Sequence, residues 1–281
     1  MLPDCTVFHE DNFVQARIIS EGEYALGSRY ASPEMLYLDS GDYNGDGTAD
    51  IGIFRENTGL WAIRGITRVY FGSSSDLPVS GDYDGDGSSD ISIFRTTAGL
   101  WAVRGITRSY FGGSTDIPIP GDYDGDGDCD IGIYRAGSGL WAIRGVTRTY
   151  FGTSGDISVP GDYAGGLAKE IAIYRPESGL WAIRGVTRSY FGGSADIPVP
   201  ADFDGDGNCD IGIYRKLSGL WAIRNITRSY FGGASDIPIS ADYLGSGSNR
   251  IGIFRPTTGL WAIRQITRVY FGTSGDQPVS R

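Results

Sequence analysis

Short apolar runs alternate with clusters of turn-forming residues along most of the chain. One unit holds four such runs, at residues 77–83, 91–95, 99–104 and 107–112, each bounded by Gly, Ser, Thr or Asp. Runs of this length that are rich in Ile, Val, Tyr and Phe predict β-strands, and no segment keeps a helical period. Pro78 falls at the start of the first run, where a strand tolerates the loss of one backbone donor.

The unit repeats every 40 residues, without insertions, around a tryptophan in the motif GLWAIR or GLWAVR. The tryptophans are Trp61, Trp101, Trp141, Trp181, Trp221 and Trp261. A fixed period of this size indicates a repeat architecture, and four strands in about 40 residues are typical of one β-propeller blade. A solenoid of β-arches is the competing architecture, but it normally has shorter coils and needs capped ends.

The two ends of the chain predict a composite blade. Residues 277–281 repeat the first strand of a blade and then stop, whereas residues 1–36 contain worn copies of the other three strands. These copies lie at 4–8, 13–17 and 24–27. We therefore predict one all-β propeller domain over residues 1–281, with six repeats in 37–276. Seven blades are favoured over six, with the N- and C-terminal strands paired in one blade so that no sheet edge is exposed.

One position of the second strand stays small in every unit. The residues there are Gly52, Ser92, Gly132, Ala172, Gly212 and Gly252. Small residues that face the aromatic rings of a neighbouring blade allow the sheets to pack about 10 Å apart. The tryptophans are therefore predicted to form the core, with a tryptophan wall open to ligand as the alternative.

The loop between the first and second strands carries carboxylates at alternate positions. From Asp82 to Asp90 they occupy positions 1, 3, 5 and 9, and Gly85 and Gly87 allow a sharp backbone wrap. Ca²⁺ takes about six to eight oxygen ligands, and the backbone oxygen at position 7 adds another. The spacing is that of an EF-hand loop, but here a strand follows instead of a helix.

Four loops fit this pattern and predict about four Ca²⁺ sites, with a solvated acidic turn as the alternative. The predicted ligands are Asp42, Asn44, Asp46, Thr48 and Asp50; Asp82, Asp84, Asp86, Ser88 and Asp90; Asp122, Asp124, Asp126, Asp128 and Asp130; and Asp202, Asp204, Asp206, Asn208 and Asp210. Four Ca²⁺ ions would add eight positive charges and take the net charge from −10 to −2.

Two further loops, 162–170 and 242–250, lack several of these carboxylates and are predicted to be empty of metal. We expect Lys169 and Arg250 to supply internal cations there, paired with Asp162 and Asp242. Simple decay of a redundant site is the alternative.

The pattern GDYDGDGxxDIxIFR, preceded by YFG, resembles the FG-GAP/VCBS repeats of integrin α-subunit-like propellers and their bacterial relatives. The resemblance covers residues 37–280, although the second half of the FG-GAP motif is replaced by Phe-Arg. It implies structural Ca²⁺ loops on one face of the propeller, ligands bound elsewhere, and an extracellular role in adhesion or recognition. It transfers no ligand, because no integrin ligand-binding residue has a counterpart here.

Composition agrees with an all-β chain, since 44 glycines and 12% aromatic residues suit short strands and tight turns. No basic stripe or arm stands out in the sequence, so nucleic acid is not an expected partner. Cys5, Cys129 and Cys209 do not form a disulfide framework and are expected to be small, partly buried thiols. No membrane span is expected, and the N-terminus does not begin a signal peptide.

No catalytic residue is predicted, because the only histidine, His9, lacks a nucleophile and an orienting partner. An enzyme would need an asymmetric pocket around His9, Glu10 and Asp11. The acid that recurs before each first strand, such as Asp76, is expected to cap a turn. Arg64 and Arg68 flank a hairpin turn that carries Ile66. This turn offers either a partner or glycan surface, or an isoleucine packed on the next blade with both arginines bridged to Asp.

We therefore predict a non-enzymatic, Ca²⁺-binding propeller that acts as an extracellular or cell-surface binding and adhesion scaffold. A multivalent lectin, with sugar pockets between the blades, is one alternative. A purely structural module that associates with itself is another. The protein or glycan ligand is not specified by the sequence.

Overall fold

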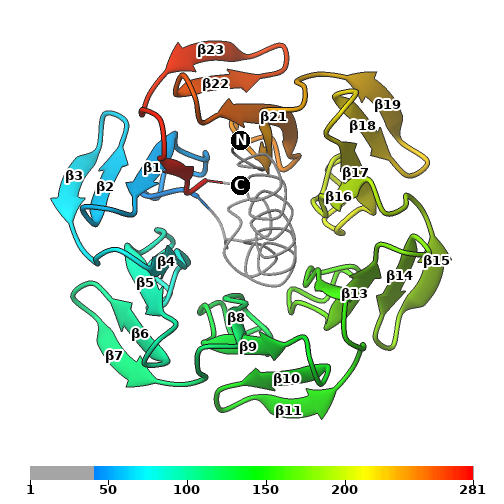
Figure 1. The fold of residues 1–281 in the computed structure, drawn as a ribbon, viewed down its shortest axis with the longest axis horizontal. Helices are drawn as coiled ribbons and strands as arrows, with labels where there is room; N and C mark the ends of the chain where they lie inside the picture. The colour runs from blue at the N-terminus through cyan, green and yellow to red at the C-terminus, as the bar shows by residue number, and fades with distance from the viewer. Residues whose placement is uncertain (1–40, 281) are drawn as a thin grey trace, which may run out of the picture.

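The structure is a computed structural model that describes residues 41–280, all of it strand, turn or loop. Its strands form six antiparallel sheets of four strands each, arranged as the blades of a propeller (Figure 1). Among the described residues, no helix has the length and apolar character needed to cross a bilayer.

Each blade begins with a short innermost strand near the axis of the ring and ends with an outermost strand at its edge. From inside to outside, blade 1 contains β24 (Gln277–Pro278), β1 (Gly52–Arg55), β2 (Leu60–Ile63) and β3 (Thr67–Tyr70). Blade 2 contains β4 (Asp76–Pro78), β5 (Ser92–Arg95), β6 (Leu100–Val103) and β7 (Thr107–Tyr110). Blade 3 contains β8 (Ile117–Pro118), β9 (Gly132–Arg135), β10 (Leu140–Ile143) and β11 (Thr147–Tyr150). Blade 4 contains β12 (Ile157–Ser158), β13 (Ala172–Arg175), β14 (Leu180–Ile183) and β15 (Thr187–Tyr190). Blade 5 contains β16 (Asp196–Pro198), β17 (Gly212–Arg215), β18 (Leu220–Ile223) and β19 (Thr227–Tyr230). Blade 6 contains β20 (Ile237–Ala241), β21 (Arg250–Arg255), β22 (Leu260–Ile263) and β23 (Thr267–Tyr270).

The preference for seven blades was wrong for the described chain, which forms six. The C-terminal strand β24 was expected in a seventh blade, but it pairs with β1 through Phe54↔Gln277 and Ile53↔Pro278. This is the register in which β8 pairs with β9. Because β24 fills the innermost position of blade 1, it leaves no strand of residues 41–280 for another blade. The three worn strands predicted within residues 1–36 lie outside the described residues.

The tryptophans form the core, as predicted. Trp141 is fully buried, its ring centroid lies 4.9 Å from that of Tyr134, and its Nε1–H donates to the carbonyl of Phe151 at 3.0 Å. The same Trp141 clusters with Ile173 and Ala182 of blade 4, so the ring fills the space between two sheets. Each repeat therefore buries its tryptophan against small and aliphatic residues of the next blade.

The glycine of the GLW motif has a specific steric role. Gly59 has a φ of +66°, and its carbonyl accepts a hydrogen bond from Phe71 N at 2.7 Å. A Cβ at this position would collide with the backbone carbonyl of Gly72. Only glycine allows the segment after β3 to lie directly against the β1–β2 turn.

An ion pair joins the first two strands of every blade. In blade 2, Arg95 donates from Nε to Asp76 Oδ1 and from Nη2 to Asp76 Oδ2, both at 2.8 Å, and this Asp76 is fully buried. The equivalent pairs are Arg55–Asp276, Arg135–Asp116, Arg175–Asp156, Arg215–Asp196 and Arg255–Asp236. Asp76 also accepts from Ser73 N at 2.8 Å, so the predicted turn cap is confirmed there, whereas its arginine partner was not foreseen.

The two cysteines within the described residues lie at blade junctions, and neither is in a disulfide. Cys129 is buried and Cys209 is half-buried. The Cys209 sulfur lies 2.8 Å from the Cβ position at Gly161 of the preceding blade, and burial raises the pKa of this thiol. Both therefore pack as small apolar groups, as expected, while Cys5 lies outside the described residues.

Candidate metal centre

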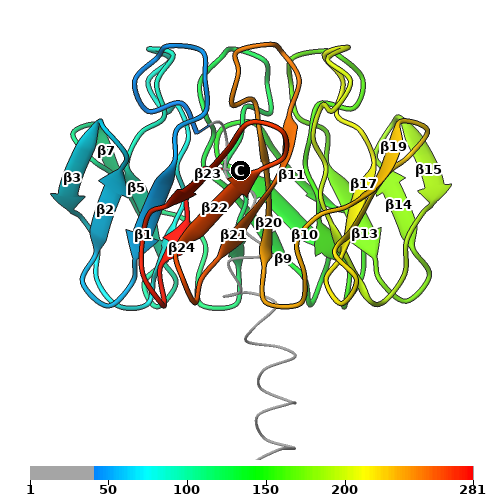
Figure 2. The same cartoon turned by 90° about the horizontal axis from the view of Figure 1, so that it is seen from above.

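The Asp-rich loops stand together on one face of the ring. Each precedes the second strand of its blade, and Figure 2 shows them projecting beyond the sheets on the same side. We call this set of six loops the crown. Its members are residues 41–50, 81–90, 121–130, 161–170, 201–210 and 241–250.

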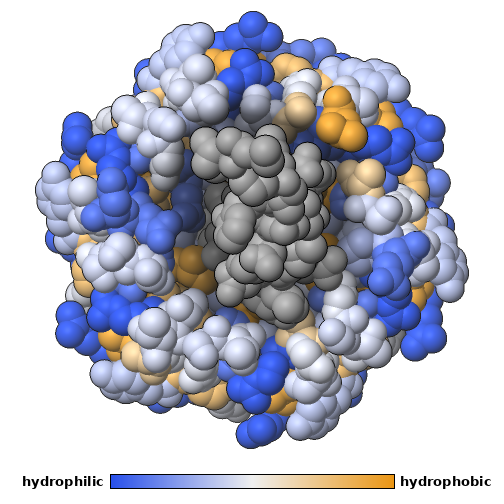
Figure 3. Space-filling model, viewed as in Figure 1, coloured by the Kyte–Doolittle hydropathy of each residue, from blue (hydrophilic) through white to orange (hydrophobic). Residues whose placement is uncertain are grey.

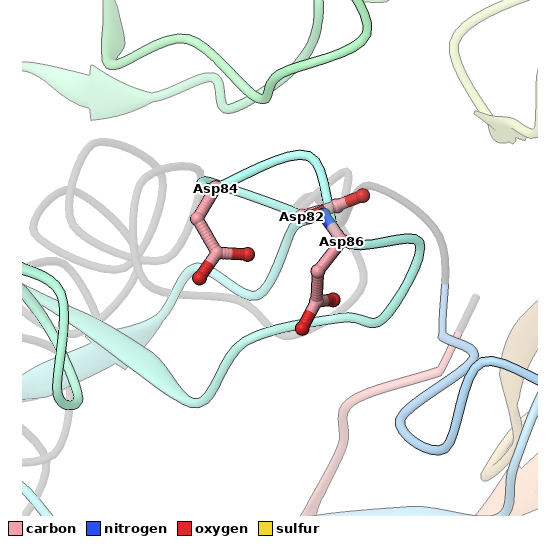
Figure 4. Close-up of side chains that lie close together, drawn as sticks. All are labelled: Asp82, Asp84 and Asp86. Carbon is pink, nitrogen blue, oxygen red and sulfur yellow. Dashed lines mark hydrogen bonds between the residues drawn. The ribbon is translucent and has the colours of Figure 1, made fainter.

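The loop of blade 2 wraps around its own carboxylates. Asp82, Asp84 and Asp86 each offer an oxygen that lies within 4.8 Å of those of the other two (Figure 4). Asp82 fixes the wrap, because its Oδ1 accepts from Asp86 N at 3.1 Å and its Oδ2 from Gly87 N at 2.8 Å. Gly85 and Gly87 have φ values of +70° and +87°, which glycine adopts without strain.

The structure brings together only part of each predicted ligand set. Asp122, Asp124 and Asp130 converge in blade 3. Asp202, Asp204 and Asp206 converge in blade 5. In blade 3 the acid at position 5, Asp126, lies outside the converging group. In blades 2 and 5 it is the acid at position 9 that lies outside the group. In blade 1, Asn44 replaces the acid at position 3, so an amide oxygen stands where the other loops place a carboxylate.

The acids at position 9 are partly committed to the backbone. Asp90 Oδ2 accepts from Tyr83 N at 2.9 Å, and Asp50, Asp130 and Asp210 make the same bond in their own loops. Burial, together with repulsion from the other loop acids, raises the pKa of Asp90, Asp130 and Asp210 to about 6. Each loop thus concentrates negative charge that a cation would compensate.

Position 7 has a structural role that the sequence did not indicate. Its side chain reaches the preceding loop, where a Cβ at Gly85 would collide with the carboxylate of Asp128. Asn208 approaches Gly165 in the same way, and Thr48 lies 3.3 Å from the Cβ position at Gly245. Ligation of metal by the backbone oxygens of Thr48, Ser88, Asp128 and Asn208 stays a prediction.

Six backbone hydrogen bonds link the loops of the crown from blade to blade. In each, the amide at position 8 of one loop donates to the carbonyl of the first Asp of the loop before it. The bonds are Ser89 N–Asp42 O at 2.5 Å, Cys129 N–Asp82 O at 2.6 Å, Lys169 N–Asp122 O at 2.7 Å, Cys209 N–Asp162 O at 2.6 Å, Asn249 N–Asp202 O at 2.6 Å and Ala49 N–Asp242 O at 2.8 Å. The last bond joins blade 1 to blade 6. The residue that begins each candidate ligand set is therefore also a joint between blades.

The two acid-poor loops keep the wrap although they lack acids at positions 3 and 5. Asp162 Oδ1 accepts from Gly165 N at 2.6 Å and Oδ2 from Leu167 N at 2.8 Å, much as Asp82 does. Lys169 extends over the preceding blade, where its Nζ lies 3.2 Å from the Cβ position at Gly121. The predicted pairing of Lys169 with Asp162 stays a prediction.

Arg250 is linked to Asp242 through the hydroxyl group of Ser246. Its Nη2 donates to Ser246 Oγ at 3.1 Å, and Ser246 Oγ in turn lies 3.4 Å from Asp242 Oδ1. The guanidinium of Arg250 thus lies in a loop that corresponds to the Asp-rich loops of blades 2, 3 and 5. Its effect is to bring positive charge to the place where those loops would hold a cation.

The donor chemistry of the crown fits a hard divalent cation. Within residues 41–280, the three converging groups consist of carboxylate oxygens only, with no sulfur or imidazole. Oxygen-only sets of this kind suit Ca²⁺ or Mg²⁺ rather than Zn²⁺ or copper. The flexible glycine-rich wrap favours Ca²⁺, which accepts irregular geometry, over Mg²⁺, which requires a near-ideal octahedron.

No family model and no curated protein matches this sequence. Among solved structures, the chain is similar to an Agrocybe aegerita lectin that recognises non-reducing terminal N-acetylglucosamine. The TM-score is 0.52 at 17% identity over 84% of this chain and 76% of the lectin. A putative 6-phosphogluconolactonase from Bacteroides uniformis has a TM-score of 0.36 at 12% identity, over 84% of this chain and 81% of that one. The likeness to the lectin supports the propeller fold alone.

Proposed function

We propose that this protein is a non-enzymatic, Ca²⁺-stabilised propeller that serves as an extracellular binding or adhesion scaffold. The observation that supports it is the convergence of carboxylate oxygens within 4.8 Å in three loops of the crown. Sites with a few carboxylates on a flexible loop fill best at the millimolar Ca²⁺ found outside cells. In this proposal the crown corresponds to the structural Ca²⁺ loops of FG-GAP/VCBS-like repeats, and a partner binds elsewhere on the ring.

The ions would act on the joints between blades. A Ca²⁺ ion bound by Asp82, Asp84 and Asp86 would hold the same residue whose carbonyl receives the amide of Cys129 from blade 3. Metal that binds only the folded ring must stabilise it by linkage. The function of the metal would then be to lock neighbouring blades rather than to carry out chemistry.

Thermal unfolding with and without Ca²⁺ tests this role. We expect millimolar Ca²⁺ to raise the melting temperature of chelator-treated protein. The double variant Asp122→Asn and Asp124→Asn should lose part of the increase. Asp162→Asn, in a loop predicted to be empty, is the matched control and should keep all of it. A melting temperature that ignores both Ca²⁺ and chelator would contradict the proposal.

Multivalent carbohydrate binding is the second candidate function. It is supported by repeated exposed tyrosines, such as Tyr110 with 74% of its surface accessible, and the Agrocybe aegerita lectin is an example of carbohydrate recognition by a protein of similar fold. Identical weak sites around a ring gain affinity for a polyvalent ligand through effective concentration. A glycan array in the presence and absence of Ca²⁺ tests it, and the absence of any glycan signal under both conditions would argue against it.

A further inference from the structure

The outer hairpins of the propeller carry a regular set of positive charges without acids. The two outer strands of each blade and the turn between them contain two arginines and no Asp or Glu. We call these twelve side chains the arginine belt. They are Arg64, Arg68, Arg104, Arg108, Arg144, Arg148, Arg184, Arg188, Arg224, Arg228, Arg264 and Arg268. In Figure 1 the hairpins that bear them form the outer circumference of the ring.

The belt arginines are exposed and unpaired within the described residues. All are exposed except Arg264, which is half-buried. Among residues 41–280, none of their side chains makes a hydrogen bond or ion pair. The arginines at the ends of β1, β5 and their equivalents behave differently, because each holds a buried Asp. The bridging of Arg64 and Arg68 to Asp, considered from sequence, therefore has no counterpart within residues 41–280.

A tyrosine accompanies the arginine on the outermost strand of each blade. Along β3, Arg68 and Tyr70 are exposed while Thr67 and Val69 are half-buried, so the two exposed side chains share one face of the strand. The tyrosines at this position have between 67% and 75% of their surface accessible. They are Tyr70, Tyr110, Tyr150, Tyr190, Tyr230 and Tyr270. A guanidinium and an open phenol ring thus recur as a unit on every blade.

Charge is strongly segregated in this protein. The net charge is −10 and the belt contributes +12, so the rest of the chain carries −22. Much of that negative charge lies in the crown. Hydrophilic residues gather around the perimeter of the face in Figure 3, with apolar ones scattered between them. The first belt arginine of each blade lies next to the end of a crown loop, since Arg64 N donates to Ile51 O at 2.8 Å, but its side chain forms no ion pair within residues 41–280. Exposed guanidinium groups that form no ion pair create a local field that favours anionic ligands.

We propose that the arginine belt binds acidic polysaccharides, with the carboxylate or sulfate groups held by guanidinium forks and the sugar faces resting on the tyrosines. Guanidinium pairs bidentately with planar anions, which lysine does not do. A polymer that touches several blades gains affinity through effective concentration. This inference rests on the proposed role of the ring as a binding scaffold, and it requires the folded ring but no ion in the crown.

An acidic polysaccharide suits the belt better than a nucleic acid does. Duplex DNA carries one charge per roughly 1.7 Å of axis, and such density would be repelled by a remainder of −22. A polysaccharide carries its charges farther apart than duplex DNA does, and it can place an anionic group on the guanidinium pair of each blade. The basic stripe that the sequence did not reveal is assembled only by the fold, from arginines spread over six repeats.

Binding to fluorescent heparin and hyaluronate tests the proposal, with neutral dextran and a double-stranded DNA oligonucleotide as comparisons. We expect both acidic polysaccharides to bind at low salt, with affinity falling as salt rises. Dextran should not bind, and the oligonucleotide should bind at least tenfold more weakly. Replacing the six strand arginines, Arg68 and its equivalents, with Gln should weaken polysaccharide binding at least tenfold. The matched replacement with Lys, which keeps the charge but loses the fork, should restore only part of it.

The melting temperature and its response to Ca²⁺ are recorded for every variant. Because the substituted side chains are exposed and unpaired, we expect both to match those of the native protein. A folded Gln variant that still binds both polysaccharides would overturn the belt proposal and leave the Ca²⁺ proposal standing. A native protein that binds neither polysaccharide, or that prefers the oligonucleotide, would also overturn it. Loss of the Ca²⁺ response with polysaccharide binding intact would instead contradict only the proposed role of the crown.

Discussion

Arg55 holds Asp276 through two hydrogen bonds, Nε–Oδ1 at 2.7 Å and Nη2–Oδ2 at 2.9 Å, although the two residues are 221 positions apart. The carboxylate is almost fully buried, and the guanidinium is about one-third exposed. The other five blades use the same pair between residues only 19 positions apart. One local motif thus connects the two ends of the described chain within blade 1.

Arg55→Gln should destabilise the protein by about 2 kcal/mol, because it leaves a buried carboxylate without its cation. The expected loss is smaller than for a fully buried pair, because solvent screens the partly exposed guanidinium. Urea unfolding measures the loss. Arg135→Gln is the matched control, since it breaks the equivalent pair within one repeat. We expect a similar global loss from both variants, but faster exchange of the Gln277 and Val279 amides from Arg55→Gln alone. Equal exchange in that strand would show that the pair does not anchor the C-terminal end.

Trp141→Phe should cost about 2–3 kcal/mol of unfolding free energy. The change removes ring volume from a fully buried site and leaves the carbonyl of Phe151 without its indole donor. Denaturant unfolding, followed by circular dichroism, provides the measurement. Tyr150→Ser, at a position with 67% of its surface accessible, should change stability by no more than about 0.5 kcal/mol. A small effect at Trp141 would contradict its role in joining blades 3 and 4.

The effect of Ca²⁺ on stability should depend on pH. The pKa values of Asp90, Asp130 and Asp210 are raised to about 6, above the ordinary value of 3.8. In metal-free protein these groups favour folding most below pH 4, and this contribution is lost as the pH rises through 6. Ca²⁺ requires the ionised form, so the increase in melting temperature on adding Ca²⁺ should grow between pH 5 and pH 7. An increase that is the same at both pH values would show that these acids are not ligands.

Gly85→Ala should weaken the junction between blades 2 and 3. The residue has a φ of +70°, and its new Cβ would meet the carboxylate of Asp128. We expect a loss of about 1–2 kcal/mol in Ca²⁺-free protein, measured by urea unfolding. Gly113→Ala is the control, because no atom lies within 4 Å of its Cβ position. If Gly85→Ala were as stable as the control, neither the left-handed backbone conformation nor the approach of Asp128 would constrain this position.

The repeat made much of the fold predictable from one sequence. Six tryptophans at a spacing of 40 residues gave the blade unit, its four strands and its buried ring. The predicted blade number was wrong because the C-terminal strand was assigned to a separate blade, whereas it completes the first repeat by pairing with β1. That choice depends on where β24 pairs, and strand pairing over such a distance leaves no local pattern in the sequence.

The side chains of the candidate metal site could be predicted from the sequence, but the hydrogen bonds and ion pairs that link the loops and strands could not. Alternating acids such as Asp82, Asp84 and Asp86 indicate a metal loop because spacing alone places them on one side of a tight wrap. The bond from Cys129 N to Asp82 O involves main-chain atoms, and any residue type could make it. Arg95 and Asp76 both recur in every repeat, so the sequence shows that the two positions are important. Only the fold shows that the two side chains face each other and form an ion pair.

Calorimetric titration of Ca²⁺ into chelator-stripped protein tests most directly whether the crown holds metal. The proposed ligand sets predict measurable heat and a stoichiometry of about four ions per chain, falling by one in the double variant Asp122→Asn and Asp124→Asn. Titration without heat, together with a melting temperature unchanged by Ca²⁺, would contradict the claim that divalent ions stabilise this ring.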